Sequence, residues 1–364
     1  VTAPEGKGNG DDVPTGLQPW HAPCLAGGGA DDHFCDLSHT RPAGGLDLGD
    51  LGARLFEHVD RMIHKTILIA IIAVFFSACK PSNEATGGGT DKPQVYAVNY
   101  PLAYFTDRIG GKLIDVHFPE TNGDPAFWKP KAADVRRFQK ADLILLNGAT
   151  YAKWITKVSL PESRAVNTSA HFRKPFIPVK NQSTHRHGKD GGHSHTGTAF
   201  TTWLDLKQAE QQAVAIRDAL IRLLPNSKHA LESNFVALQK NLQALDTELK
   251  ETAVKFVETP LVGSHPVYQY LARAYNLKIR SVHWEPDEMP DEDGWAELET
   301  IRKEHPAKIM LWEGKPDKAI ARMLMEQGVS SVVFDPCGNR LGEGDWLSVI
   351  QANISQLGSI APEK

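Results

Sequence analysis

Short apolar runs that alternate with helical patterns constrain the fold of this chain more than any other feature of its sequence. Ala141-Asp-Leu-Ile-Leu-Leu-Asn147 is a continuous apolar run with a polar end, which is typical of a strand buried on both faces of a parallel sheet. Similar strand patterns lie at 94–99, 113–118, 260–263, 278–282, 308–312 and 331–334, with helical patterns at 100–111, 131–140, 204–224, 267–275, 295–304, 319–327 and 345–357. This alternation predicts βαβ units in two α/β lobes, each with a small, mostly parallel sheet flanked by helices.

A longer helical pattern, at 227–257, separates the two series of strands. Leu238, Leu242, Leu245 and Leu249 repeat at spacings of three and four, with Lys, Gln and Glu on the opposite face. At 1.5 Å per residue, a helix of this length would span roughly 45 Å, more than the width of a small lobe. It is either one more surface helix or a strut that joins the two lobes.

Three ionisable residues lie within two residues of the ends of strand patterns in the second series. They are His265, Glu313 and Asp335. Open α/β sheets bind ligands at the carboxyl ends of their strands, so we expect these side chains to meet in one site. The segment His283-Trp-Glu285, with Asp287 and Glu288, also follows a strand. It is either a metal site or a solvated loop near the cleft, and we interpret it as the loop.

A histidine-rich tract precedes the helical pattern at 204–224. His185, His187, His193 and His195 lie among Gly, Lys, Asp, Ser and Thr, a composition that cannot build a core and predicts a solvated loop at 181–199. Neutral imidazole is a common zinc ligand. The tract is either a metal-binding segment or a polar loop that takes up metal incidentally.

An apolar run of about ten residues follows Arg61, His64 and Lys65, and ends at Ser77-Ala78-Cys79. Basic residues, a short apolar run and small residues are the parts of a secretory signal, and the run is too short to cross a bilayer. The end resembles a bacterial lipobox, which implies lipid attachment at Cys79. The alternative is a buried apolar strand or helix.

The predicted organisation follows from these patterns. Since secretory signals act from the N-terminus, we expect Met62 to be the true start and the Gly-, Pro- and Asp-rich segment before it to be non-native or disordered. The net charge of -4 gives no indication of a nucleic-acid surface. The expected parts are an extension at 1–61, a lipoprotein signal peptide at 62–79, a flexible tether at 80–93, an N-terminal lobe at 94–226, a linking helix at 227–257 and a C-terminal lobe at 258–364.

A series of motifs resembles the solute-binding receptors of zinc and manganese ABC transporters. The motifs are Tyr100-Pro-Leu-Ala, Arg108-Ile-Gly-Gly111, Gly123-Asp-Pro125, Ala141-Asp-Leu-Ile-Leu-Leu-Asn-Gly148, Trp203-Leu-Asp205, Ser264-His265, Tyr268-Gln-Tyr-Leu, Glu313-Gly-Lys-Pro316 and Phe334-Asp-Pro336. The resemblance covers about 95–357, in order and with proper spacing. It implies two Rossmann-like lobes bridged by one long rigid helix, with a metal in the cleft between them.

The implied metal site is only half present in this chain. The family places a histidine where Ala126 stands and another where Thr201 stands, whereas the two C-terminal positions are filled by His265 and Asp335. Neither alanine nor a threonine hydroxyl is a normal zinc ligand. We therefore hypothesise that His195 and His193 enter the cleft and complete the site. Glu313, His185 and His187 are further or supporting candidates.

The resemblance implies a binding protein rather than an enzyme. The expected function is a monomeric, lipid-anchored receptor on the periplasmic or extracytoplasmic face of a bacterial membrane, which delivers metal to a permease. Imidazole nitrogen favours Zn²⁺ over Mn²⁺. One alternative is a zinc hydrolase, although the chain carries no HExxH-type motif and no convincing general base. Another is a metal-buffering or adhesion lipoprotein with a degenerate site.

Overall fold

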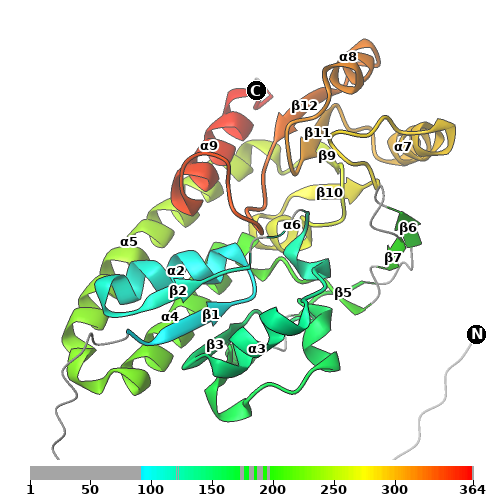
Figure 1. Ribbon diagram of the computed structural model, residues 1–364. Helices are drawn as coiled ribbons and strands as arrows, with labels where there is room; N and C mark the ends of the chain where they lie inside the picture. Colours follow the sequence, from blue (N-terminus) through cyan, green and yellow to red (C-terminus); the bar gives the residue numbers. More distant parts are fainter. Residues whose placement is uncertain are drawn as a thin grey trace, which may run out of the picture. The chain divides into compact units, whose positions relative to one another are not determined.

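The computed structural model of the protein describes most of the chain from Lys92 onward. The described residues are 92–119, 121, 123–172, 176–179, 184–186, 192–194 and 197–362, with only the backbone described at 184–186 and 192–194. Residues Gly88–Lys364 form one compact unit (Figure 1). The predicted extension 1–61 and signal peptide 62–79, including Cys79, lie outside the described residues and stay predictions.

Four parallel strands form the sheet of the N-terminal lobe, in the order β2-β1-β3-β4. The strands are β1 Gln94–Ala97, β2 Asp115–His117, β3 Leu143–Leu146 and β4 Ala165–Asn167. β3 lies between two neighbours, and Ile144 and Leu145 at its centre are fully buried. The continuous apolar run therefore forms the inner strand that its pattern predicted.

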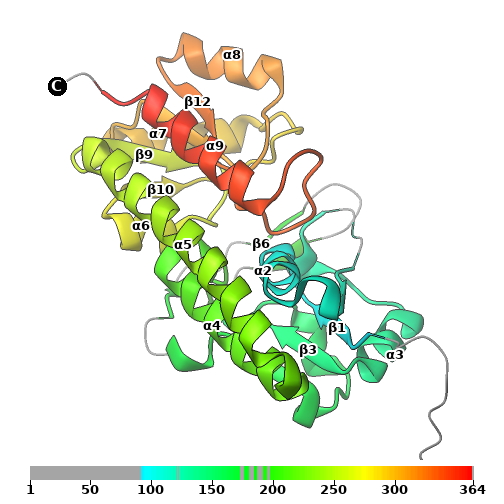
Figure 2. The same ribbon diagram turned by 90° about the vertical axis from the view of Figure 1, so that its left-hand side faces the viewer.

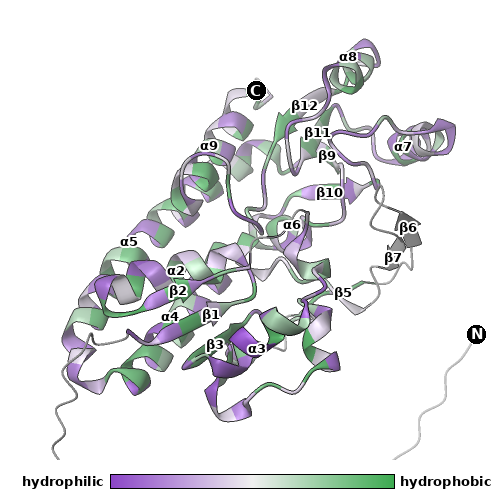
Figure 3. Ribbon diagram, viewed as in Figure 1, coloured by the Kyte–Doolittle hydropathy of each residue, from purple (hydrophilic) through white to green (hydrophobic). Residues whose placement is uncertain are grey.

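The C-terminal lobe repeats this arrangement. Its sheet has the order β10-β9-β11-β12, and every neighbouring pair is parallel. The strands are β9 Pro260–Gly263, β10 Lys278–Ser281, β11 Ile309–Trp312 and β12 Ser330–Val333. The inner strand β11 is buried throughout and is drawn green in Figure 3, whereas the edge strand β10 alternates with exposed residues and is mostly purple. The predicted two-lobed α/β fold is confirmed.

The helices lie between and around the strands at nearly the predicted positions. The α-helices are α2 Tyr100–Gly110, α3 Ala132–Lys140, α4 Leu206–Leu223, α5 Lys228–Ala253, α6 Gln269–Tyr275, α7 Glu292–Glu304, α8 Lys318–Glu326 and α9 Trp346–Ser359. Short 3-10 helices are η1 Gly111–Leu113, η2 Pro125–Phe127, η3 Lys153–Lys157, η4 Glu162–Arg164, η5 Ala170–Phe172, η7 Thr202–Leu204, η8 Pro225–Ser227 and η9 Val254–Phe256. Within the described part of the chain, none of these helices has the length and apolar character needed to cross a bilayer.

The long helix α5 contacts both lobes. It packs against α2 and α4 of the N-terminal lobe and against α6 and α9 of the C-terminal lobe (Figure 2). Its predicted leucine stripe is buried, and one hydrophobic core continues along it from the N-terminal to the C-terminal lobe. Its 26 residues span about 39 Å at 1.5 Å per residue. Of the two interpretations of this pattern, the structure supports the strut: α5 joins the two lobes.

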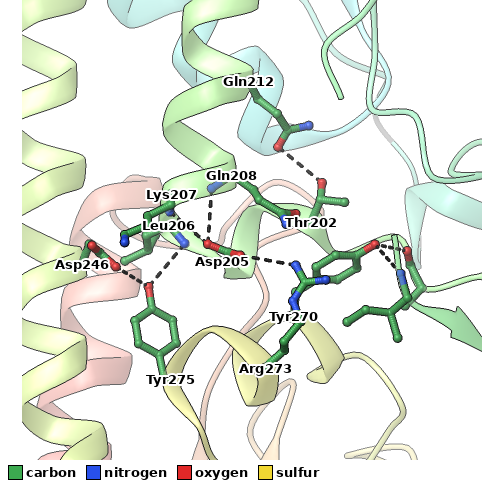
Figure 4. Close-up of polar contacts among 12 residues, drawn as sticks. Thr202, Asp205, Leu206, Lys207, Gln208, Gln212, Asp246, Tyr270, Arg273 and Tyr275 are labelled. Carbon is green, nitrogen blue, oxygen red and sulfur yellow. Dashed lines mark hydrogen bonds and ion pairs between the residues drawn. The ribbon is translucent and has the colours of Figure 1, made fainter. Parts of the chain in front are cut away.

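Polar contacts join the start of α4 to the C-terminal lobe (Figure 4). Asp205 caps α4 by accepting hydrogen bonds from the Lys207 and Gln208 N–H groups, and its carboxylate also pairs with Arg273 at 3.4 Å. The Tyr275 hydroxyl accepts a hydrogen bond from the Leu206 N–H and donates one to Asp246 of α5. A single capping carboxylate thus begins a helix and ties the two lobes together.

Two short ladders lie between η5 and η7. β5 Pro178–Val179 pairs antiparallel with β8 Gly197–Thr198. The backbone of β6 Thr184–Arg186 pairs antiparallel with that of β7 Gly192–Ser194, which places His185 opposite His193 in the register. The tract that the sequence predicted as a solvated loop thus contains backbone pairing at these positions, which needs no apolar side chains.

Candidate metal centre

All four strands of the C-terminal sheet end near one cavity. β9 is followed by Ser264 and His265, β11 by Glu313, and β12 by Phe334 and Asp335. β10 is followed, four residues on, by Glu285. Since the strands are parallel, their carboxyl ends share one edge of the sheet, and these ionisable side chains all line the same cavity.

His265, Glu285 and Glu313 form a compact cluster. One donor atom from each lies within 4.8 Å of the others, a spacing that suits ligands of a single metal ion. The His265 Nδ1 atom lies 3.6 Å from a Glu285 carboxylate oxygen and 3.5 Å from a Glu313 carboxylate oxygen. The imidazole is 5 % exposed, and the two carboxylates are 28 % and 26 % exposed. The cluster is therefore largely desolvated but open toward the cavity.

Negative charge is concentrated at this edge. Burial raises the pKa of the Glu313 carboxyl well above its usual range, and the carboxylates of Glu285, Asp124 and Asp335 raise it further. Burial also raises the pKa of Asp335, although a hydrogen bond from the Cys337 N–H opposes this shift. Carboxylates held close together and out of water favour the uptake of a cation, because its charge offsets both the mutual repulsion and the lost solvation.

Asp335 is held in place by backbone and amide contacts. Its carboxylate accepts a 2.7 Å hydrogen bond from the Cys337 N–H, within a turn where Cys337 has a φ of +56°. Asn353 of α9 accepts from the Asp335 N–H at 3.1 Å and donates to the Asp335 carbonyl at 2.8 Å. These bonds fix the direction in which the Asp335 side chain leaves the strand end.

The cavity that these residues line has a volume of about 1060 Å³ and also receives side chains from the N-terminal lobe. Ala126 and Thr201 are both part of this wall. The Thr201 hydroxyl donates a 2.5 Å hydrogen bond to the Val267 carbonyl, and the Ala126 side chain has no donor atom. The two positions without a histidine therefore face the same cavity as His265 and Asp335.

Of the predicted site residues, the structure brings together His265, Glu313 and Asp335. His187 and His195 lie outside the described residues, as do the side chains of His185 and His193. Glu285 was interpreted as part of a solvated loop, and its place in the cluster was missed. The strand-end rule that selected the other three would have found it had the rule been extended past residues that directly follow a strand.

Two parallel α/β lobes, a core continuous along one helix, and a cavity lined by ionisable side chains define a two-lobed solute-binding protein. The chain belongs to the family described as ZnuA, zinc-uptake complex component A periplasmic, whose model matches residues 95–359. It is therefore a substrate-binding protein of a metal ABC transporter, as the resemblance implied.

Relatives within this group are named for different metals. The chain is 26% identical over 273 residues to the high-affinity zinc uptake system protein ZnuA of Bacillus subtilis, covering 71% of this chain and 84% of that one. It is 25% identical over 309 residues to the manganese ABC transporter substrate-binding lipoprotein scaA of Streptococcus gordonii, covering 80% and 96%. It is 27% identical over 306 residues to the iron ABC transporter substrate-binding lipoprotein MtsA of Streptococcus pyogenes serotype M1, covering 80% and 96%.

Solved structures share the fold. The metal-dependent lipoprotein YcdH from Bacillus subtilis matches with a TM-score of 0.63 and 22% identity, covering 74% of this chain and 98% of that one. The Zn(II)-bound ZnuA-like domain of AdcA from Streptococcus pneumoniae matches with a TM-score of 0.62 and 21% identity, covering 75% and 100%. At these identities the likeness concerns the fold alone, and the choice of metal has to come from the donors of this chain.

Proposed function

We propose that the protein captures zinc outside the membrane and delivers it to the permease of an ABC transporter. The observation that carries this proposal is the largely buried cluster of His265, Glu285 and Glu313 at the edge of a cavity between two lobes. Asp335 lines the same cavity and adds a further oxygen donor. The metal is cargo, so the site works by binding and release, and no bond of a substrate is broken.

The choice of zinc depends on nitrogen donors beyond this cluster. The cluster offers one imidazole and two carboxylates, and a donor set rich in oxygen suits manganese at least as well as zinc. We propose that His195 and His193 supply the additional imidazoles. His195 lies two residues before Gly197, where β8 begins, and Phe200 and Thr201 farther along line the cavity. His195 therefore lies only six residues along the chain from Thr201 on the cavity wall.

The test is a comparison of zinc and manganese affinities in His193→Ala/His195→Ala. We expect zinc affinity to fall at least tenfold, about 1.4 kcal/mol, while manganese affinity changes much less. His171→Ala/His229→Ala, which removes two exposed histidines from η5 and α5, is the matched control. If the wild type and both double variants bind zinc equally well, His193 and His195 are not metal ligands. The oxygen-rich cluster would then be the whole metal centre, and it suits manganese at least as well as zinc.

We also propose that lipid on Cys79 anchors the receptor at the outer face of the membrane. Several relatives are named lipoproteins, and the basic, apolar and small-residue pattern of 62–79 supports the same arrangement here. Cys79→Ala should move the protein from the membrane fraction to the soluble fraction of cells. Retention of the variant in the membrane fraction would contradict lipid attachment at this residue.

A further inference from the structure

The cavity is much larger than a metal ion requires. Its volume is about 1060 Å³, whereas a water molecule occupies about 30 Å³ in the liquid and pockets for organic ligands hold about 300–1,000 Å³. The donor cluster lies on its C-terminal wall. Most of the residues that line the cavity belong to the N-terminal lobe, and the composition of that wall indicates what occupies the space beside the metal.

The N-terminal wall carries several aromatic side chains together with lysines. Phe127, Trp128 and Phe200 are partly buried and line the cavity, together with Lys153 and Lys157 of η3. Lys153 also lies over the Phe127 ring, 5.4 Å from its centroid. Ammonium groups repel a bare divalent cation and attract an anion, and aromatic faces pack against an organic body. Asp124 is the acidic residue of this wall, and one of its carboxylate oxygens already accepts from the Ala126 N–H.

Tyr151 provides an independent observation on the same wall. It lines the cavity, it is 5% exposed, and its hydroxyl has no hydrogen-bond partner among the described residues. The ring is held edge-on against Phe200 and Trp203, at centroid distances of 5.3 and 5.8 Å. A buried hydroxyl without a partner is unfavourable, and an acceptor oxygen that arrives with the cargo would satisfy it.

We infer that this receptor takes up its metal together with a small organic anion that carries at least one carboxylate. The inference rests on the proposed function and specifies its substrate class. The metal lies on the His265–Glu285–Glu313 cluster, the organic body packs on Phe127, Trp128 and Phe200, and a carboxylate oxygen accepts from Tyr151 and pairs with Lys153. The anion also supplies donors on the side of the cavity where Ala126 and Thr201 offer none.

The first experiment compares zinc alone with zinc in the presence of excess citrate or of histidine, which chelates zinc as the histidinate anion. Binding is followed by calorimetry, and native mass spectrometry determines whether the anion stays with the protein. We expect at least one of the two anions to form a ternary complex, with an apparent zinc affinity at least tenfold above that predicted from simple competition for zinc. If both anions only withdraw zinc as their solution affinities dictate, the inference is overturned while the proposed function stands. If zinc does not bind under any of these conditions, both fail.

Substitutions in the N-terminal wall identify the contact. Tyr151→Phe and Lys153→Met should each weaken the ternary complex about tenfold, and weaken zinc alone by less. Tyr96→Phe on β1 and Lys140→Met at the end of α3 make the same chemical changes outside the cavity and serve as controls. Losses of equal size for zinc alone and for the ternary complex would show that the wall supports the fold rather than an anion, and would also overturn the inference.

Discussion

The two lobes share one topology but use the same edge of their sheets for different purposes. Both sheets have four parallel strands in the order second, first, third, fourth. In the C-terminal lobe the residues that follow the strands are ionisable and face the cavity. In the N-terminal lobe Asn99 and Asn147, which follow β1 and β3, are buried amides. The repeated fold thus determines where a site can form, and the residue type at the strand ends determines whether it does.

Hydrogen bonds explain why the N-terminal edge does not offer these amides to a ligand. The Asn99 side chain donates to the side-chain amide oxygen of Asn147 at 3.0 Å, and Gln212 of α4 donates to the same oxygen at 3.1 Å. The Asn147 amide nitrogen donates to the Phe200 carbonyl at 3.0 Å, and Gln212 also reaches the Thr168 hydroxyl at 3.0 Å. A buried network in which the amides satisfy one another stabilises the lobe and leaves little capacity for a metal.

Removal of the His265 imidazole, at the carboxyl edge of the C-terminal sheet, should have the largest effect on metal affinity. His265→Ala deletes the one nitrogen donor of the cluster, so we expect metal affinity to fall about 100-fold, or about 3 kcal/mol. Titration with zinc and manganese measures the effect. The exposed His229→Ala on α5 is the control, and a His265→Ala protein that keeps its metal affinity would disprove the proposed centre.

At the N-terminal edge we expect a substitution to lower stability and to leave metal affinity nearly unchanged. Asn147→Ala leaves Gln212 and Asn99 without their shared acceptor, which should lower the free energy of unfolding by about 2 kcal/mol. Metal affinity should change less than threefold. Denaturant unfolding and metal titration test both parts. A large loss of metal affinity with intact stability would mean that the two edges are not functionally distinct.

Adding an imidazole to the N-terminal wall tests whether the difference in metal donors between the two lobes depends on single residues. Ala126→His places a nitrogen donor at a position that lines the cavity, and we expect zinc alone to bind about tenfold more tightly, or about 1.4 kcal/mol. The same variant should gain less from an added organic anion, because the new imidazole takes a place in the coordination sphere. Ala133→His at the start of α3, outside the cavity, is the matched control.

The smallest expected effect concerns a contact between the lobes. Asp345 caps α9, and its carboxylate accepts a 2.9 Å hydrogen bond from the Tyr104 hydroxyl of α2. Burial alone would raise its pKa, but hydrogen bonds from Ser348 and Tyr104 hold the pKa of Asp345 below its usual value. A lowered pKa contributes stability above the pKa of the unfolded state, about 3.9, and this contribution is lost as the pH falls through the lower folded value.

Asp345→Asn keeps a residue that can cap the helix and removes only the charge. The wild-type protein should therefore be more stable than this variant at pH 7 by a few tenths of a kcal/mol, since the group is partly solvated, and the difference should vanish at low pH. Denaturant unfolding at several pH values measures it. A difference that does not depend on pH would assign the effect to the cap geometry instead of the charge.

The elements that the sequence predicted well are those with strong local patterns. Helices α4 and α5 have clear apolar periodicity, and the inner strands β3 and β11 are continuous apolar runs. β4 was missed, since it is only three residues long and partly exposed, with Asn167 at its end. Its place at the edge of the sheet follows from pairing with β3, which is a tertiary contact. A strand of three residues is too short to show this pairing in its sequence pattern.

The candidate site also contains residues that the sequence could predict and residues that only the fold brings into place. His265, Glu313 and Asp335 could be predicted because each lies within two residues of a strand end. Glu285 lies four residues past β10, and only the path of the intervening segment brings it to His265. The sequence also could not predict that Asn147 belongs to a buried hydrogen-bond network. A polar residue after a strand can either bind a ligand or stabilise the fold. Spacing along the chain identifies strand ends, but distances across the sheet require the fold.

The core that runs along α5 has a consequence for how the chain folds. Because α5 packs on helices of both lobes within one hydrophobic cluster, neither group of helices completes its packing without α5. The lobes should therefore melt together in one cooperative transition in calorimetry, with equal calorimetric and van't Hoff enthalpies. A fragment that ends before α5 would expose the faces of α2 and α4 that this helix covers, and should aggregate rather than fold as an independent domain.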